Sequence, residues 1–194
     1  VAVGYAALDA NTTGQRNTAV GQQAMGFNTT GDYNTALGRD SLHKNTTADN
    51  NVAVGYGALY ENTTGANNVA VGASAGEDNT TGHSNTMVGQ HTGGDTTTGH
   101  SNTFLGYAAG NYSVLNTTGL RNVIVGAYSR ATAADADQAM VLGYDVAGAA
   151  GYTTLGSGTS DIRAQHGVAT WATVSDERYK KDIVDSTAGL SFIN

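Results

Sequence analysis

The stretch that decides the fold is "NTAVGQQAMGFNTTGDY" (17–33), because the chain repeats it with small changes along most of its length. A glycine that follows an apolar pair returns every 17 residues, except for one step of 20 residues after Gly106. These glycines are Gly4, Gly21, Gly38, Gly55, Gly72, Gly89, Gly106, Gly126 and Gly143. A period this strict is typical of a stacked array, in which each unit buries its apolar edge on its neighbours.

The repeat unit predicts an all-β fold. It has β-branched residues, two or more glycines and no run long enough for helical periodicity. We therefore predict a β-solenoid or β-roll, with two short strands per coil from the N-T-A-V-G and A-L stretches. Tight turns at N-T-T-G should join the strands, since Asn and Gly tolerate positive φ. Coils stack roughly 4.8 Å apart, so about eight coils would form a shaft of about 40 Å.

An asparagine stands four positions before most of the repeat glycines. Stacking would align these side chains, and we predict a ladder in which each amide bonds to the next coil. The members are Asn17, Asn34, Asn51, Asn68, Asn85, Asn102 and Asn122.

Two further positions of the repeat vary together. Early coils have alanine two residues before the glycine and Leu or Met four residues after it, whereas Met87 and Phe104 share their coils with Gly93 and Gly110. We expect both positions to fill one interior layer of fixed volume, and so to be in contact. Ala70 and Gly76 are both small, which predicts a thin layer in their coil.

Composition excludes several classes of function. The 194 residues carry a net charge of −7, which argues against a nucleic-acid partner, and no apolar run approaches the roughly 20 residues of a membrane span. The chain contains no cysteine. We find no phosphate-binding loop and no carboxylate pair suited to glycan hydrolysis, so we expect no cofactor and no substrate-directed enzyme activity. The sequence begins at Val1 in mid-pattern, and we interpret it as part of a longer protein.

A single coil brings only about four apolar residues, little to offset backbone ordering of roughly 1–2 kcal/mol per residue. Oligomerisation would supply the missing burial. The N-T-A-V-G repeat over residues 1–146 resembles the β-roll heads of trimeric autotransporter adhesins and repeats of phage tail-fibre proteins. This resemblance implies a homotrimer.

The repeat fades into a Gly/Ser/Thr-rich connector and a terminal strand (147–174), which includes "VATWATV". The following "SDERYKKDI" (175–183) closely resembles the opening of the intramolecular chaperone domain of endosialidases and phage tail spikes. That resemblance implies a domain that trimerises the fibre and then cuts the Val174–Ser175 bond, with Ser175 as nucleophile and Lys180 as base. Asp176 and Arg178 would hold the geometry of this pair.

A lysine removes a proton from serine only when burial lowers its pKa toward 7. Residues 175–194 resemble a truncated start of this helical domain. Self-cleavage is therefore expected only of the full-length precursor.

Four weaker patterns have plainer explanations. His83 and His100 share one repeat phase and could bind a metal in a trimer, although surface histidines in turns are commoner. A stripe of Tyr5, Tyr56, Tyr107 and Tyr144 could contact sugars, but scattered surface tyrosine is the simpler interpretation. The N-T-T sequons are read as turn chemistry. Paired threonines could form an ice-binding array, which the interrupted repeat disfavours.

Together these patterns predict the structural and adhesive shaft of a trimeric viral (phage) tail fibre used in host attachment. Its partners would be its own copies, other tail-fibre proteins of the virion and a host receptor or glycan, with neither nucleic acid nor membrane insertion. The alternative is the head domain of a trimeric adhesin on a bacterial cell surface.

Overall fold

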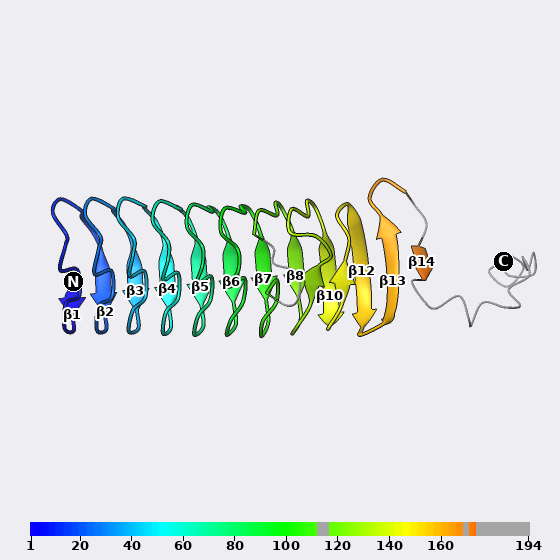
Figure 1. Ribbon diagram of the computed structural model, residues 1–194, viewed down its shortest axis with the longest axis horizontal. Helices are drawn as coiled ribbons and strands as arrows, with labels where there is room; N and C mark the ends of the chain where they lie inside the picture. The colour runs from blue at the N-terminus through cyan, green and yellow to red at the C-terminus, as the bar shows by residue number, and fades with distance from the viewer. Residues whose placement is uncertain (112–116, 169–170, 174–194) are drawn as a thin grey trace, which may run out of the picture.

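The computed structural model describes residues 1–111, 117–168 and 171–173, and it is a β-solenoid. The chain winds around one long axis, and successive coils place their strands side by side (Figure 1). One sheet has the order β1–β8, β10, β12, β13 and β14, and β9 and β11 form a second, two-stranded sheet. The strands are β1 (Ala2–Val3), β2 (Thr18–Val20), β3 (Thr35–Leu37), β4 (Val52–Val54), β5 (Val69–Val71), β6 (Thr86–Val88), β7 (Thr103–Leu105), β8 (Val123–Val125), β9 (Arg130–Ala131), β10 (Met140–Tyr144), β11 (Ala147–Gly148), β12 (Tyr152–Ser157), β13 (Ser160–Gln165) and β14 (Trp171–Thr173).

The register of the sheet follows the sequence repeat. Ala19 pairs with Ala36 and Ala36 with Ala53, each 17 residues on, and the longer step pairs Phe104 with Ile124. All pairs from β1 to β12 are parallel. The all-β solenoid with a 17-residue repeat is therefore confirmed, and no helix occurs among the residues that the structure describes.

The solenoid continues past the last repeat glycine. β12 pairs in parallel with β10, which adds a turn and gives about nine in all, and β13 and β14 then pair antiparallel. The segment 147–174, expected as a connector with a terminal strand, thus contains β11, β12 and β13 before the strand β14. The longer alternating strands of this region replace the repeat motif.

The second strand expected in each coil is absent, within the described residues, from the seven coils whose repeat glycines run from Gly4 to Gly106. There the segment after the repeat glycine has positive φ at two positions, as at Ala6 (52°) and Leu8 (54°), which an extended strand cannot have. Its amides still bond to adjacent coils: the Gln23 N–H donates to the Tyr5 carbonyl at 2.8 Å. The prediction of a second strand is correct only for β9 and β11, which pair in parallel.

The core is one layer of small and large side chains. Ala19, Ala36, Ala53 and Ala70 are fully buried, as are Met87, Phe104, Ile124 and Val141 in the later coils. A β-carbon added at Gly93 would lie 2.8 Å from both Met87 Sδ and Phe104 Cδ2, so the two covarying positions are in contact, as predicted.

The thin layer at Ala70 and Gly76 is filled by the neighbouring coils. A β-carbon at Gly76 would lie 2.7 Å from Met87 Cε of the following coil and 3.1 Å from Leu59 Cδ2 of the preceding coil. The interior volume is therefore shared between coils, and one small pair leaves no gap.

Candidate interaction surfaces

The outward face of the large sheet carries an unbroken line of aliphatic side chains. In the parallel strands this residue directly precedes the repeat glycine or its equivalent, and in the antiparallel β13 it is Ile162, which pairs with Leu155; each of these side chains is exposed or half-buried. We call this line the aliphatic row: Val3, Val20, Leu37, Val54, Val71, Val88, Leu105, Val125, Leu142, Leu155 and Ile162. Val3 is 57% exposed, Leu37 47% and Leu105 46%, so large apolar groups face solvent on the isolated chain.

A second outward row lies two residues earlier in each strand. It is made of threonine and aliphatic residues and is also exposed or half-buried. This Thr/Val row consists of Thr18, Thr35, Val52, Val69, Thr86, Thr103, Val123, Met140 and Thr153. None of the side chains in either row is charged.

Parallel sheets are almost always covered on both faces. With strands about 4.8 Å apart, the aliphatic row runs for roughly 50 Å over eleven strands. Contiguous apolar surface of this extent marks an interaction site. The sheet face is therefore the candidate interaction surface that the fold itself creates.

The asparagines predicted to form a ladder lie buried beside the start of each strand. The Asn34 side-chain carbonyl accepts the backbone N–H of Asn51 at 2.9 Å, and its amide group donates to the Ala48 carbonyl of the next coil at 2.7 Å. The same bonding joins Asn17 through Asn122. Each side chain thereby satisfies buried backbone groups of the following coil.

The asparagines of the N-T-T turns form a second ladder, which sequence reasoning interpreted only as turn chemistry. The Asn45 amide donates to the Asn28 side-chain oxygen at 2.7 Å, and the Asn62 amide donates to Asn45 at 3.0 Å. These asparagines also recur every 17 residues, at a different phase from the first ladder, so the same periodicity could have predicted both ladders. The second one is interrupted where Thr96 replaces Asn, leaving the buried side-chain oxygens of Asn79 and Thr96 without a hydrogen bond.

The first threonine of the N-T-T turns in the first five coils also contributes to the stacking. Its hydroxyl donates to the threonine carbonyl of the next coil, as from Thr29 to Thr46 at 2.9 Å. The second threonine of each pair is exposed, which leaves a single row of exposed threonines at this corner: Thr13, Thr30, Thr47, Thr64, Thr81, Thr98 and Thr118.

His83 and His100 lie directly over one another. Their ring centroids are 4.5 Å apart and their planes differ by 8°. A metal lies in the plane of each imidazole that binds it, so two rings stacked in this way do not chelate one ion. No group of three or more His, Cys, Asp or Glu among the described residues is arranged to hold a metal.

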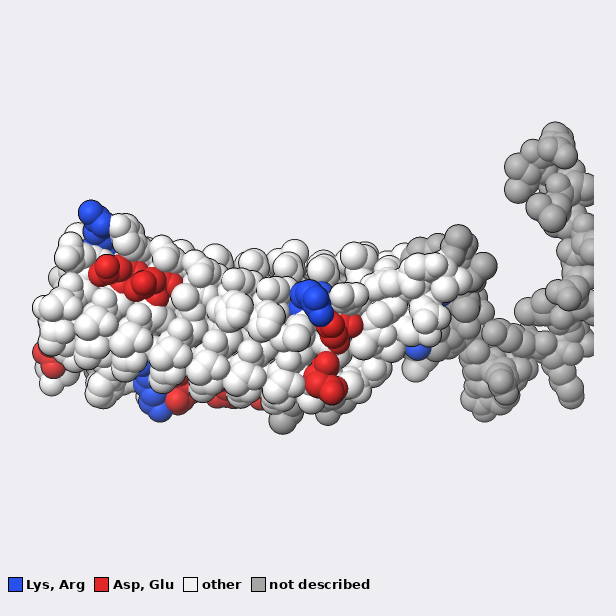
Figure 2. Space-filling model, turned by 90° about the horizontal axis from the view of Figure 1, so that it is seen from above, with Lys and Arg blue, Asp and Glu red and all other residues white. Residues whose placement is uncertain are grey.

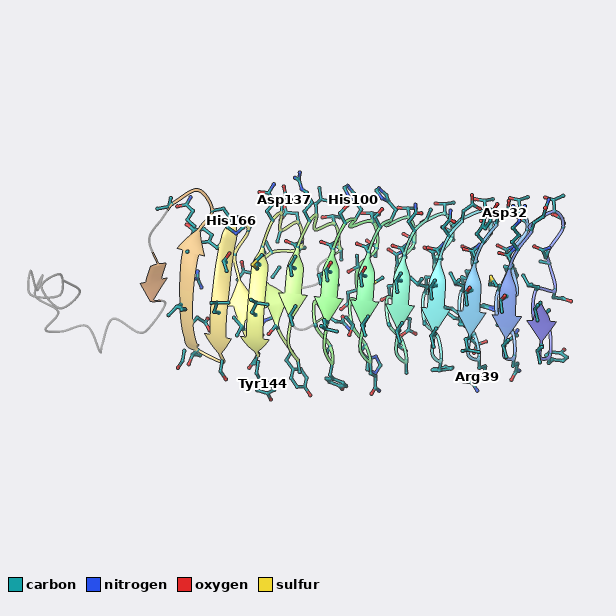
Figure 3. All side chains as sticks on the ribbon, turned by 180° about the vertical axis from the view of Figure 1, so that it is seen from behind. Asp32, Arg39, His100, Asp137, Tyr144 and His166 are labelled. Carbon is teal, nitrogen blue, oxygen red and sulfur yellow. The ribbon has the colours of Figure 1, made fainter. Side chains whose placement is uncertain are left out.

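The tyrosines of the predicted stripe divide into separate groups. Tyr107 and Tyr144 each make an edge contact with Tyr128, at centroid distances of 5.2 Å and 5.9 Å, whereas Tyr56 lies under the Arg39 guanidinium. Arg39 and Tyr144 occupy one long edge of the shaft, and Asp32, His100 and Asp137 occupy the opposite edge (Figure 3).

Charged side chains form small groups on the face shown in Figure 2. Burial raises the pKa of Asp78 above its ordinary 3.8, and the charges of Glu77 and Glu61 raise it further. Burial and the charge of Asp78 likewise raise the pKa of Asp95. By contrast, hydrogen bonding to Arg121 lowers the pKa of Asp137.

The proposed self-cleavage residues lie outside the described part of the chain. This applies to Val174, Ser175, Asp176, Arg178 and Lys180, all within residues 174–194. Their roles stay predictions from the sequence.

Comparison of the chain with protein-family models, with curated proteins and with solved structures finds no match. The described residues include no helix of the length and apolar character needed to cross a membrane. The class that the fold defines is thus a repetitive all-β solenoid with an apolar sheet face.

Proposed function

We propose that the chain is the structural and adhesive shaft of a homotrimeric viral fibre used in host attachment. The observation that carries this proposal is the aliphatic row, which leaves eleven Val, Leu or Ile side chains on the outside of the sheet. Three copies would turn their sheet faces toward a common axis and cover these rows.

The small interior of each coil supports association. Its inward strand residue is alanine in the first coils, whereas the larger valine and leucine of the same strands face outward. Burying one further CH₂ group contributes about 0.8 kcal/mol, so a row repeated along the shaft supplies a substantial driving force.

The number of subunits and the biological setting rest on the two resemblances. The repeat resembles trimeric adhesin heads and tail-fibre repeats, and "SDERYKKDI" resembles a trimerising chaperone. We therefore place the protein in a virion tail fibre, next to other fibre proteins and a host receptor or glycan.

A single-cysteine experiment tests the interface, because the chain has no native cysteine. Val54→Cys places a thiol in the middle of the sheet face, and Thr64→Cys places one on the exposed threonine corner. Oxidation should link Val54→Cys into covalent dimers while Thr64→Cys stays unlinked at equal concentration. Equal linking of both variants, or linking of Thr64→Cys alone, would contradict this interface.

Self-processing is tested on the full-length precursor. Wild-type protein should yield a fragment ending at Val174, and Ser175→Ala should remain uncut, because the nucleophilic hydroxyl is removed. Identical masses with and without the substitution would contradict self-processing and would leave the proposal of a trimeric shaft unaffected.

The second candidate is the head domain of a trimeric bacterial adhesin, which the N-T-A-V-G repeat also favours. The residues after Asn194 in the natural protein decide between them. A complete chaperone domain supports the viral fibre, and a membrane-anchoring coiled coil supports the adhesin.

A further inference from the structure

Phe27 is an aromatic residue at a position of the repeat where the neighbouring coils have none. Phe27 is 53% exposed, and hollows of about 280 Å³ and 140 Å³ lie on either side of it. In the same repeat phase the neighbouring coils have Ala10 and Lys44. Stacking of the coils therefore does not require this ring.

The ring is held in place by its neighbours. Phe27 contacts the His43 ring edge to face, with centroids 4.9 Å apart, and His43 in turn stacks on Tyr60 at 5.1 Å. A hydrogen bond of 3.0 Å from the His43 ring to the Gln23 carbonyl fixes this packing. Gly26 leaves room for it, since a β-carbon there would lie 3.2 Å from the imidazole. Because these contacts fix the orientation of the exposed Phe27 ring, a ligand that packs on it would pay little for ordering this side chain.

The larger hollow combines an apolar wall with a charged rim. Phe27, Lys44, Thr46 and Thr63 line it. The threonine hydroxyls donate to carbonyls of the next coil, so these residues offer the hollow little hydrogen-bonding capacity. Lys44 lines the hollow, and its ammonium lies 2.8 Å from both carboxylate oxygens of Glu61, a residue outside the lining, so a donor and an acceptor lie side by side next to the hollow.

The smaller hollow adds further polar groups. Asp9 and Gln23 line it, together with Ala6, Ala10, Gly26, Phe27 and His43. Phe27 thus lies between an almost wholly apolar depression and one that also contains polar groups. At about 280 Å³ the larger hollow is just below the roughly 300–1,000 Å³ of typical small-molecule pockets, which suits one ring rather than an extended ligand.

We propose that Phe27 and the adjoining Lys44–Glu61 pair form a binding site for a neutral pyranose sugar unit. The C–H groups on one face of a pyranose carry partial positive charge and pack on the negative face of an aromatic ring. Its hydroxyls both donate and accept, which matches the ammonium–carboxylate pair at the rim. Glu61 already neutralises Lys44, and the chain carries a net charge of −7, so a neutral sugar fits better than an acidic one.

This inference rests on the proposed attachment function, because it names the class of receptor that the shaft would contact. The test uses the 194-residue chain and four neutral sugars: glucose, galactose, mannose and N-acetylglucosamine. Saturation-transfer NMR and titration calorimetry should detect at least one of them, with a dissociation constant in the millimolar range.

Variants locate the site. Phe27→Ala should weaken binding at least tenfold, Phe27→Trp should retain it, and Lys44→Met should weaken it several-fold. Tyr144→Ala is the matched control, because Tyr144 is 58% exposed but lines neither hollow, and it should bind like wild type. Thermal unfolding of each variant checks that the fold is intact.

Two results would overturn the inference: equal binding by wild type and Phe27→Ala, or no binding of any of the four sugars by folded wild type. The mass of the same samples reports the assembly separately. Trimers that bind no sugar would leave the shaft proposal standing, whereas monomers that bind through Phe27 would keep the sugar site and contradict the shaft.

Discussion

At the scale of single residues, the repeat glycines explain why the period is so strict. Gly72 has φ +137°, a conformation that residues with a side chain rarely adopt, and a β-carbon there would lie 2.6 Å from the Gly89 carbonyl carbon. The coil therefore needs glycine for both its backbone conformation and its close approach to the next coil. Other left-handed positions are less demanding, since Arg16, Tyr33 and Ser101 occupy them with φ near +60°.

We predict that Gly72→Ala lowers the free energy of unfolding by roughly 3 kcal/mol or more, through backbone strain and overlap with the next coil. Ser101→Gly, at an exposed position with φ +60°, should change it by about 0.5 kcal/mol or less. Urea unfolding of both variants measures the difference. Similar stability of the two would show that the repeat glycines are not structurally required.

The raised pKa of Asp78 predicts a pH dependence of stability. A carboxylate whose pKa is higher in the folded state stabilises the fold below its unfolded value, here near 3.8, and this contribution is lost as the pH rises. Asp78→Asn should therefore raise the unfolding midpoint at pH 7 and leave it almost unchanged at pH 3.

Asp137→Asn provides a control of opposite sign. Arg121 lowers the pKa of Asp137, so this carboxylate stabilises the fold above pH 3.8 and the contribution is lost as the pH falls. Its replacement should slightly lower the midpoint at pH 7. A lower midpoint at pH 7 for Asp78→Asn would contradict the assignment.

At the scale of one coil, the interior is a shared layer rather than a set of separate pockets. Phe104 is fully buried, and a β-carbon at Gly110 would lie 3.0 Å from its ring. Earlier coils reach the same filling with Ala and Leu, as at Ala53 and Leu59. Leu59 has φ +52°, so a leucine can occupy the backbone position that Gly110 holds.

This layer predicts strong coupling between Phe104 and Gly110. Phe104→Ala should cost about 3–5 kcal/mol by leaving a cavity, and Gly110→Leu about 1–3 kcal/mol or more by overpacking. The double variant restores the Ala and Leu combination of the early coils. Its loss of unfolding free energy should be smaller than the sum of the two single losses by over about 1 kcal/mol. Denaturant unfolding of all four proteins measures the coupling, and purely additive effects would contradict a shared layer.

The coil also shows what sequence alone could and could not provide. The period of 17 aligned Asn34 with Asn51 and Met87 with Gly93, because stacked coils convert spacing directly into contact. The positive φ at Ala6 and Leu8 had no signal, since neither residue type prefers that conformation. β12 was missed because Thr153 and Leu155 lie outside the motif although they continue both outward rows. Each hollow beside Phe27 is lined by residues from three coils, which no single repeat phase reveals.

At the scale of the whole molecule, two kinds of surface coexist on one shaft. Polar turns run along its long edges, and the uncharged aliphatic and Thr/Val rows occupy the sheet face. The second asparagine ladder and a row of threonine hydroxyls add hydrogen bonds between coils. The coils therefore stack without using the outward side chains of the sheet. That face remains available for other chains.

The most direct test is the mass of the 194-residue chain in solution, measured by sedimentation equilibrium. Covering of the aliphatic row in a homotrimer predicts a mass of three times 19.7 kDa, and a double charge substitution, Val54→Lys with Val71→Lys, should reduce it to that of a folded single chain. A wild-type protein that stays at 19.7 kDa at all concentrations, or a trimer that the two lysines leave intact, would contradict the account.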